Sequence, residues 1–143
     1  MFVNEWGIEL GELAFMENFA TWVTGFFEGA IPLIQALRRR HRVGCLSNTN
    51  AIHWARLPGI ADIFDFCFPS HATGCMKPDR EAYMNVLREL RVSAERIWFF
   101  DDLLPNVAAA RESGMRAFHV DGFPELRQLL QAEGLAVCLN DQP

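Results

Sequence analysis

The stretch that decides the fold is Arg96-Ile97-Trp98-Phe99-Phe100-Asp101-Asp102-Leu103-Leu104-Pro105-Asn106. Four large apolar residues lead directly into two adjacent carboxylates. Such a short apolar run is typical of a strand buried on both faces of a parallel sheet, and open α/β sheets bind their ligands at the carboxyl ends of strands. Neighbouring like charges repel unless solvent, a cation or a basic group neutralises them. The stretch therefore predicts either a metal or catalytic site or an exposed turn with Asp102 or Asn106 near a helix N-cap.

On both sides of this stretch, apolar residues recur with the spacing of helices or form short apolar runs. The predicted strands cover residues 42–46, 64–68, 97–100, 117–120 and 135–139. The predicted helices cover residues 8–27 (one or two helices), 31–40, 51–57 (a weak helix or a turn), 78–90, 105–113 and 124–132. From residue 31 on, helices and strands alternate, which indicates an α/β fold with a Rossmann-like parallel sheet and flanking helices. Pro69 ends the second strand, which suits an edge of the sheet.

Length and composition limit the classes of protein to which the chain can belong. The chain has 143 residues, of which half are hydrophobic, so it holds at most one ordinary domain plus a fragment. The net charge of −5 argues against a nucleic-acid or membrane partner, and the basic run 38–42 fits the last turn of a helix. Its four cysteines form no C-x-x-C pair, so a zinc site is poorly supported. With no signal-peptide pattern and no apolar run of about 18 residues, we expect a cytoplasmic protein.

Polar residues of different kinds follow three of the predicted strands. Ser47 and Asn48 follow the first, Lys77 lies in the loop after the second, and Asp101 and Asp102 end the third. In a parallel sheet these ends converge on one rim. The hydroxyl and backbone N–H groups can hold phosphate oxygens, the ammonium can neutralise them, and carboxylates can hold a hard cation such as Mg²⁺. Taken singly, each residue fits ordinary loop or turn chemistry as well; their order and spacing together indicate a phosphate site.

These pieces form a recognisable set of motifs. The set is Cys45-Leu46-Ser47-Asn48-Thr49-Asn50, Met76-Lys77-Pro78-Asp79, and Phe99-Phe100-Asp101-Asp102 with Asn106 and Gly114-Met115. It resembles motifs two, three and four of the haloacid dehalogenase superfamily, over roughly residues 29–122. Among the branches of that superfamily it is most similar to the sugar-phosphate phosphatases and the phosphatase domain of soluble epoxide hydrolases.

The resemblance implies phosphoryl transfer through an aspartyl-phosphate, with Mg²⁺ as cofactor and a small phosphorylated molecule as substrate. It implies that Ser47 and the Asn48 amide bind the phosphoryl group and that Lys77 steadies the phosphate and the nucleophile. It assigns Asp101 and Asp102 to the metal, and Asn106 to the support of their loop. Residues 1–28 then correspond to the remnant of a helical cap, and residues 29–143 to an α/β core.

The family's first motif, a strand that ends in Asp-x-Asp, has no counterpart here. The acids before Ser47 are all glutamates, and none forms such a pair: Glu5, Glu9, Glu12, Glu17 and Glu28. Carboxylate attack makes the covalent intermediate, so we predict no phosphatase turnover by this chain alone. In the family the missing strand is central, between the strands that end at Ser47 and Asp102. Its loss would leave two unpaired edges, which makes self-association possible.

Three explanations stay open: a longer gene product with a misplaced start, a proteolytic remnant, or a truncated protein that fills the gap with its own N-terminus or a partner's strand. The functional alternatives are a non-catalytic pseudoenzyme or interaction module and a metal-independent 2-haloacid dehalogenase. The adjacent acids favour the metal-dependent branch over the dehalogenase. His53, Trp54 and His71 flank the rim and could touch a substrate or be ordinary loop residues. The substrate itself cannot be read from the sequence.

Overall fold

The computed structural model describes residues 11–57 and 59–135. Its strands are β1 (Gly44–Ser47), β2 (Phe66–Pro69), β3 (Trp98–Asp101) and β4 (Arg116–His119). Its helices are α2 (Glu12–Ala20), α3 (Ala30–Arg38), α4 (Ala51–Ala55), α5 (Ile60–Ile63), α6 (Ser70–Thr73), α7 (Arg80–Leu90), the 3₁₀ turn η1 (Ala94–Arg96), α8 (Leu104–Glu112) and α9 (Gly122–Ala132). The predicted alternation of helices and strands is confirmed.

The strands form two separate parallel pairs. β1 pairs with β2, with Cys45 opposite Cys67, and β3 pairs with β4, with Phe99 opposite Ala117. Within the described ranges no strand joins β1 to β3, so the parallel sheet is divided in its middle. Among the described strands β2 has β1 as its one partner, which agrees with the edge position that Pro69 predicts.

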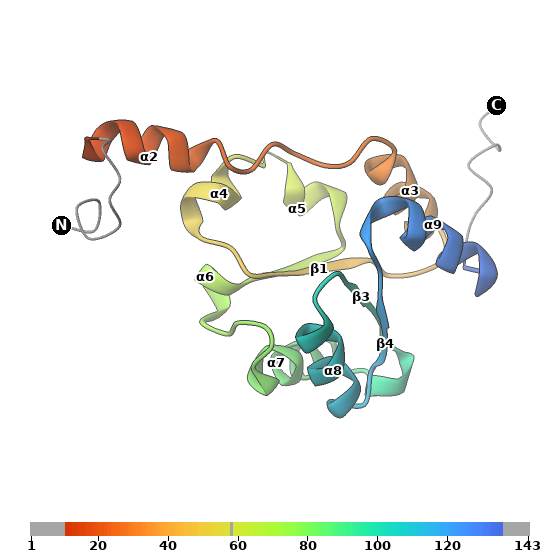
Figure 1. The fold of residues 1–143 in the computed structure, drawn as a ribbon. Coiled ribbons are helices and arrows are strands. Elements are labelled where there is room, and N and C mark those ends of the chain that lie inside the picture. Colours follow the sequence, from red (N-terminus) through yellow and green to blue (C-terminus); the bar gives the residue numbers. More distant parts are fainter. Residues whose placement is uncertain (1–10, 58, 136–143) are drawn as a thin grey trace.

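Helices cover the strands on two sides (Figure 1). α3 and α9 lie on one side, and α7 and α8 lie on the other. The N-terminal ends of α3 and α9 meet where the Phe27 and Phe123 rings stack with centroids 6.3 Å apart. The main core lies on the α7 and α8 side. Its buried residues are Phe68, Ala82, Tyr83, Val86, Val107, Ala110, Met115 and Ala117.

The side chains of β3 point alternately to the two sides of the strand, so its apolar run packs against both helical layers. Phe99 points into the main core and meets Tyr83 edge to face at 5.7 Å. Trp98 and Phe100 point to the opposite side, where both stack on Phe118 of β4, at 5.2 and 5.5 Å. Successive side chains of a strand face opposite sides, so an all-apolar strand fits between two helical layers, as the sequence predicts.

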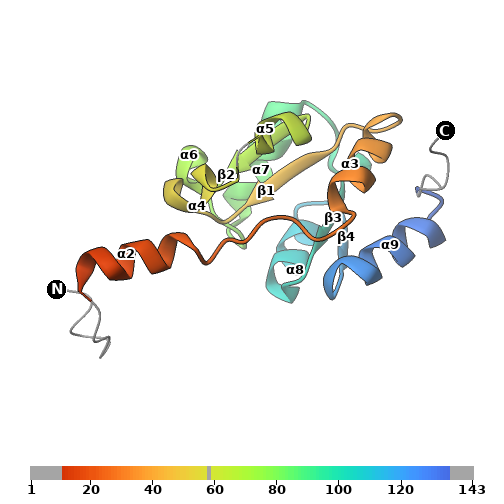
Figure 2. The ribbon, with the colours of Figure 1, turned by 90° about the horizontal axis from the view of Figure 1, so that it is seen from above.

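The largest departure from the predicted elements is at the N-terminal end. One or two helices are predicted over residues 8–27, of which residues 8–10 lie outside the described part of the chain. α2 ends at Ala20, and the chain then runs without regular structure until α3 (Figure 2). Val23, Thr24 and Gly25 fall in this segment, and β-branched residues and glycine are poor helix formers. The predicted strand 135–139 lies outside the described residues except for Leu135. The short helix α6 occupies part of the predicted loop that follows the second strand and contains Lys77.

α2 is held to the rest of the chain through α4. The Phe19 ring packs on the His53 imidazole at 4.4 Å, and Nε2 of His53 lies 2.8 Å from the Phe19 carbonyl oxygen. Nδ1 of the same ring lies 3.1 Å from the Asn50 side-chain nitrogen. Among the described helices none has the length and apolar character needed to cross a membrane.

Candidate functional site

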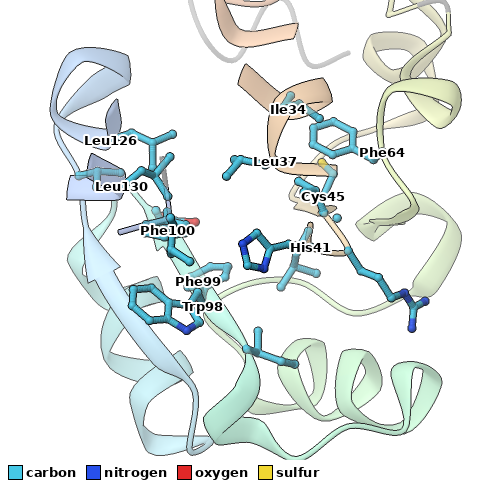
Figure 3. Close-up of a pocket in the computed structure, with 18 of the residues that line it drawn as sticks. Ile34, Leu37, His41, Cys45, Phe64, Trp98, Phe99, Phe100, Leu126 and Leu130 are labelled. Atoms are coloured by element: carbon cyan, nitrogen blue, oxygen red, sulfur yellow. The ribbon is translucent and has the colours of Figure 1, made fainter. Parts of the chain in front are cut away.

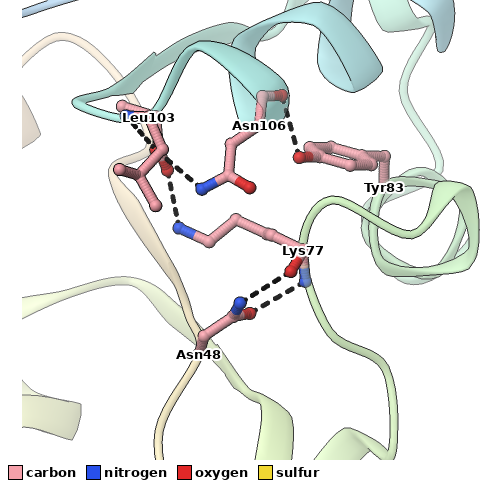
Figure 4. Close-up of polar contacts among 6 residues, drawn as sticks. Asn48, Lys77, Tyr83, Leu103 and Asn106 are labelled. Atoms are coloured by element: carbon pink, nitrogen blue, oxygen red, sulfur yellow. Dashed lines mark hydrogen bonds and ion pairs between the residues drawn. The ribbon is translucent and has the colours of Figure 1, made fainter.

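The site is built around the carboxylate of Asp101, the last residue of β3. This side chain is buried and accepts hydrogen bonds from Lys77 Nζ (2.7 Å), from Asn106 Nδ2 (2.8 Å) and from the Leu103 backbone N–H (2.9 Å) (Figure 4). Burial raises the pKa of the Asp101 carboxyl, but these hydrogen bonds outweigh that effect and leave the pKa below its ordinary value. Asp101 is therefore charged and held in one orientation.

Lys77 is positioned by its backbone as well as by its ammonium group. The Asn48 side chain donates to the Lys77 carbonyl oxygen (2.7 Å) and accepts from the Lys77 N–H (2.8 Å) (Figure 4). This pair of bonds ties the end of β1 to the loop before α7. Only 12% of the Lys77 side chain is exposed, and its ammonium lies 5.7 Å from the centre of the Phe99 ring. The cation thus sits at the rim in a fixed place.

A buried tyrosine supports the loop between Asp101 and α8. The Tyr83 hydroxyl donates to the Asn106 carbonyl oxygen at 2.9 Å, and both residues are buried. Burial, and then the charge of Asp101, raises the pKa of Tyr83 to about 12. The sequence places Tyr83 in the predicted helix 78–90 and assigns it no role in the site. Its spacing gave no sign that its hydroxyl would reach Asn106.

The two adjacent acids are in different surroundings. Asp101 is buried, whereas Asp102 is exposed, and its carbonyl oxygen lies 3.0 Å from His119 Nε2. Mg²⁺ prefers oxygen ligands, and Asp102 offers an accessible carboxylate of that kind. However, both oxygens of Asp101 already accept hydrogen bonds, and the described residues contain no group of three side chains suited to a metal ion. The residues present therefore fit only part of a magnesium site.

The structure brings together most, but not all, of the site residues predicted from the sequence. Asn48, Lys77, Asp101 and Asn106 form one hydrogen-bonded network. Ser47 lies at the end of β1, next to Asn48, and is half-buried. The resemblance implies that the Asn48 amide binds the phosphoryl group. In the structure the Asn48 side chain forms two hydrogen bonds with the Lys77 backbone.

Of the three residues that flank the rim, His53 is engaged in the contact with α2 described above. Trp54 and His71 lie beside each other, with ring centres 6.0 Å apart. Their contact with a substrate stays a prediction. His119, which the sequence analysis did not place in the site, links the end of β4 to the backbone of Asp102.

Comparison with known proteins gives the same family as the sequence motifs. The family model of haloacid dehalogenase-like hydrolases matches residues 12–114. The phosphatase MT3486 of Mycobacterium tuberculosis is 34% identical over 122 residues, which are 80% of this chain and 56% of that protein. The D-ribitol-5-phosphate phosphatase of Bacteroides thetaiotaomicron is 28% identical over 132 residues, covering 83% of this chain and 64% of that protein.

A solved structure supports the fold. The HAD family enzyme bt-2542 of Bacteroides thetaiotaomicron, as an Asp-to-Ala mutant in complex with magnesium and inorganic phosphate, matches with a TM-score of 0.78 at 21% identity. The match covers 89% of this chain and 70% of that one. The chain thus spans a little over half to two thirds of the length of these curated relatives. On the family match and the 34% identity, the chain belongs to the haloacid dehalogenase-like hydrolases.

Proposed function

We propose that the rim formed by Ser47, Asn48, Lys77 and Asp102 is the phosphate-binding part of a phosphatase that acts on small phosphomonoesters. The observation that carries this proposal is the Lys77 ammonium, almost buried at the carboxyl rim and fixed by Asp101 and Asn48. A cation held in place in a site of low dielectric attracts an anion more strongly than a solvated one does. The phosphatase names of the two relatives support this chemistry over dehalogenation.

In this proposal each residue has a definite task. The Ser47 hydroxyl and the backbone N–H groups that follow it donate to phosphate oxygens, and Lys77 balances their charge. Asp101 keeps Lys77 charged and oriented, and Asn106 keeps the Asp101 carboxylate in place. Mg²⁺, when bound at the exposed Asp102 carboxylate, would neutralise further phosphate charge. The bt-2542 complex contains both magnesium and phosphate, which supports the pairing of these two ligands.

We further propose that residues 1–143 alone do not turn over a phosphomonoester. No aspartate precedes Ser47 in this sequence, and a carboxylate nucleophile at the rim is what the covalent route needs. The site network contains Asp101 in an ion pair with Lys77, which removes its carboxylate from attack. The assignment of residues 1–28 to a cap remnant and 29–143 to a core remains part of this proposal.

The decisive experiment measures binding rather than turnover. Inorganic phosphate is titrated into the purified chain with and without MgCl₂, and binding is followed by ³¹P line broadening and calorimetry. Lys77→Met and Ser47→Ala should each weaken phosphate binding at least tenfold. Arg88→Met, which alters an exposed ion pair with Glu81, is the matched control and should bind like the wild type. Equal binding by the wild type and both rim variants would refute the phosphate site.

Turnover is a separate measurement. The wild-type chain is assayed with p-nitrophenyl phosphate and with a sugar phosphate in the presence of Mg²⁺, and no release of phosphate above the blank is expected. A robust rate that depends on Mg²⁺ would overturn the proposed inactivity but would leave the phosphate site standing. Release of halide from 2-chloropropionate would favour the dehalogenase alternative instead.

A further inference from the structure

Exposed apolar residues border the rim that we propose to bind phosphate. They lie in segments that directly follow β1 and β3 and in the loop that carries Lys77: Ile52 (39% exposed), Met76 (54%), Leu103 (56%) and Leu104 (65%). We call these four residues the apolar collar. Single exposed apolar side chains are ordinary on a protein surface, whereas a group of them beside a polar site marks a place where a ligand or a partner is bound.

Two members of the collar are fixed by the hydrogen bonds of the site itself. The Leu103 N–H donates to the Asp101 carboxylate (2.9 Å), which also accepts from Lys77 Nζ (2.7 Å) (Figure 4). Met76 directly precedes Lys77, whose backbone N–H and carbonyl oxygen are both bonded to the Asn48 side chain. The apolar collar is therefore continuous with the cation that the proposed function assigns to phosphate.

The exposure of the collar does not result from the division of the sheet. The division leaves a cavity of about 1150 Å³ between β1 and β3, which is lined by apolar side chains of both strands and of α3 and α9 (Figure 3). Asp102 lines this cavity, whereas none of the four collar residues does. The apolar collar is thus a separate surface beside the phosphate rim.

Polar side chains near the ends of β1 and β2 are already bonded within the chain. Asn50 Oδ1 accepts from the His53 N–H (2.9 Å), and Asn50 Nδ2 lies 3.1 Å from Nδ1 of the His53 ring. Ser70 Oγ accepts from the Thr49 N–H and donates to the Thr49 carbonyl oxygen, both at 2.9 Å. A site that recognises sugar hydroxyls needs donors and acceptors that are available to the ligand, and these side chains are used elsewhere.

Three further polar side chains near the rim are accounted for differently. The proposed function assigns Ser47 to the phosphate and Asp102 to Mg²⁺. The exposed His71 ring lies beside Trp54, with ring centres 6.0 Å apart. Among the described residues around the rim, the surface left for the organic part of a substrate is therefore chiefly apolar.

We propose that the apolar collar binds the organic group of the substrate, so that the substrate is a phosphomonoester of an apolar alcohol and not of a sugar. The inference rests on the proposed phosphate site and names the substrate class of that site. An apolar group gains affinity in proportion to the apolar area that it removes from water. A sugar in the same place would lose water from its hydroxyls without gaining partners for them.

The experiment compares ligands that share the phosphate and differ in the organic group. Inorganic phosphate, glucose 6-phosphate and the n-butyl, n-hexyl and n-octyl phosphates, each below its micelle concentration, are titrated into the full chain with MgCl₂ and followed by calorimetry. Affinity should rise with alkyl length, and octyl phosphate should bind about tenfold or more tighter than inorganic phosphate. Glucose 6-phosphate should bind no tighter than inorganic phosphate. Equal affinities for octyl phosphate and glucose 6-phosphate would overturn the proposal.

Variants locate the alkyl chain. In Met76→Gln and in Leu104→Gln the ratio of the octyl phosphate affinity to the inorganic phosphate affinity should fall at least threefold. The ratio should not change in Leu13→Gln, at an exposed position of α2, or in Leu126→Gln, inside the large cavity (Figure 3). A ratio that falls in Leu126→Gln but not in the collar variants would place the alkyl chain in the cavity and overturn the proposal. The alkyl series on the unaltered chain needs no variant and stands if a variant does not fold.

The remaining outcomes separate this inference from the proposed function. If inorganic phosphate does not bind, the phosphate site is refuted and this inference with it. If inorganic phosphate binds but alkyl length has no effect, this inference alone is refuted. Octyl phosphate that binds Lys77→Met as tightly as the wild type would bind away from the rim and would overturn it. A dimer that excludes octyl phosphate would assign the collar to a second copy and overturn it as well.

Discussion

Lys77 Nζ lies 2.7 Å from Asp101 Oδ2, and both side chains are largely removed from water. The two residues are 24 positions apart in sequence, so their contact ties the loop before α7 to the end of β3. A buried ion pair adds little net stability compared with apolar residues, but the loss of one partner leaves the other charge uncompensated. Because of this asymmetry, a substitution that removes one charge of the pair should destabilise the chain.

Asp101→Asn should therefore destabilise the chain by about 3 kcal/mol, within the usual range for breaking a buried pair. The asparagine keeps the shape of the side chain, so the loss reports the charge. Urea unfolding followed by circular dichroism measures it. Glu81→Gln breaks an exposed pair with Arg88 and should change the free energy of unfolding by less than about 1 kcal/mol. Equal losses in the two variants would contradict a special role for the Lys77–Asp101 pair.

The same pair gives the stability a definite dependence on pH. The pKa of Asp101 is lowered in the folded chain relative to its ordinary value of 3.8, so the unfolded chain binds protons first as the pH falls. The stabilisation is complete above the unfolded pKa and is lost as the pH falls through the folded pKa. The gap in stability between wild type and Asp101→Asn should thus narrow below about pH 4. Urea unfolding of both proteins from pH 7 to pH 3 checks this.

One other carboxylate must be controlled in that experiment. The pKa of Asp65 is also lowered, chiefly by the hydrogen bond from the Val43 N–H and by Arg38. Asp65→Asn in both backgrounds removes its part of the acid dependence. A gap that stays constant down to pH 3 in the Asp65→Asn background would show that Asp101 does not have a lowered pKa.

Much of the fold follows from local sequence patterns. The apolar run of β3 and the proline at the end of β2 predict these two strands and the edge position of β2. The helices of the core begin and end near their predicted residues. The hydrogen bonds around Asp101 could not be predicted from local sequence patterns. The clamp between Asn48 and Lys77 and the bond from Tyr83 to Asn106 join residues 29 and 23 positions apart. Spacing along the chain carries no signal for such contacts, because they depend on how the strands are placed.

The Tyr83 hydroxyl should titrate with a midpoint at about pH 12 in the folded chain, as its raised pKa implies. Tyr83 is the only tyrosine in the sequence, so the absorbance of tyrosinate at 295 nm reports it alone. Because the folded pKa exceeds the unfolded value of 10.0, its contribution to stability is present below pH 10 and is lost as the pH rises toward 12. The urea-unfolded chain, with a midpoint near its ordinary value, is the control. A native midpoint near 10 would contradict burial of the hydroxyl.

Tyr83→Phe tests the hydrogen bond itself. The substitution keeps the ring in the core and removes the hydroxyl that donates to the Asn106 carbonyl oxygen. A hydrogen bond of this kind contributes about 0.5–1.5 kcal/mol, because the Asn106 carbonyl oxygen keeps its partner within α8, and urea unfolding should show a loss of that size. The Leu103 and Asn106 amides should also exchange faster with solvent, because the loop loses its support. A loss below about 0.5 kcal/mol would mean that water replaces the hydroxyl.

Gly44→Ala should disturb the packing at the start of β1. A Cβ built at Gly44 would lie 1.7 Å from a carbon of the Phe66 ring, so that ring must move. Overpacking of this kind costs about 1–3 kcal/mol, measurable as a lower midpoint in urea. Gly11→Ala is the matched control, since nothing lies within 4 Å of a Cβ there. In a Phe66→Ala background the cost of Gly44→Ala should nearly vanish, because the clash is removed; a cost that persists would locate the strain in the β1 backbone instead.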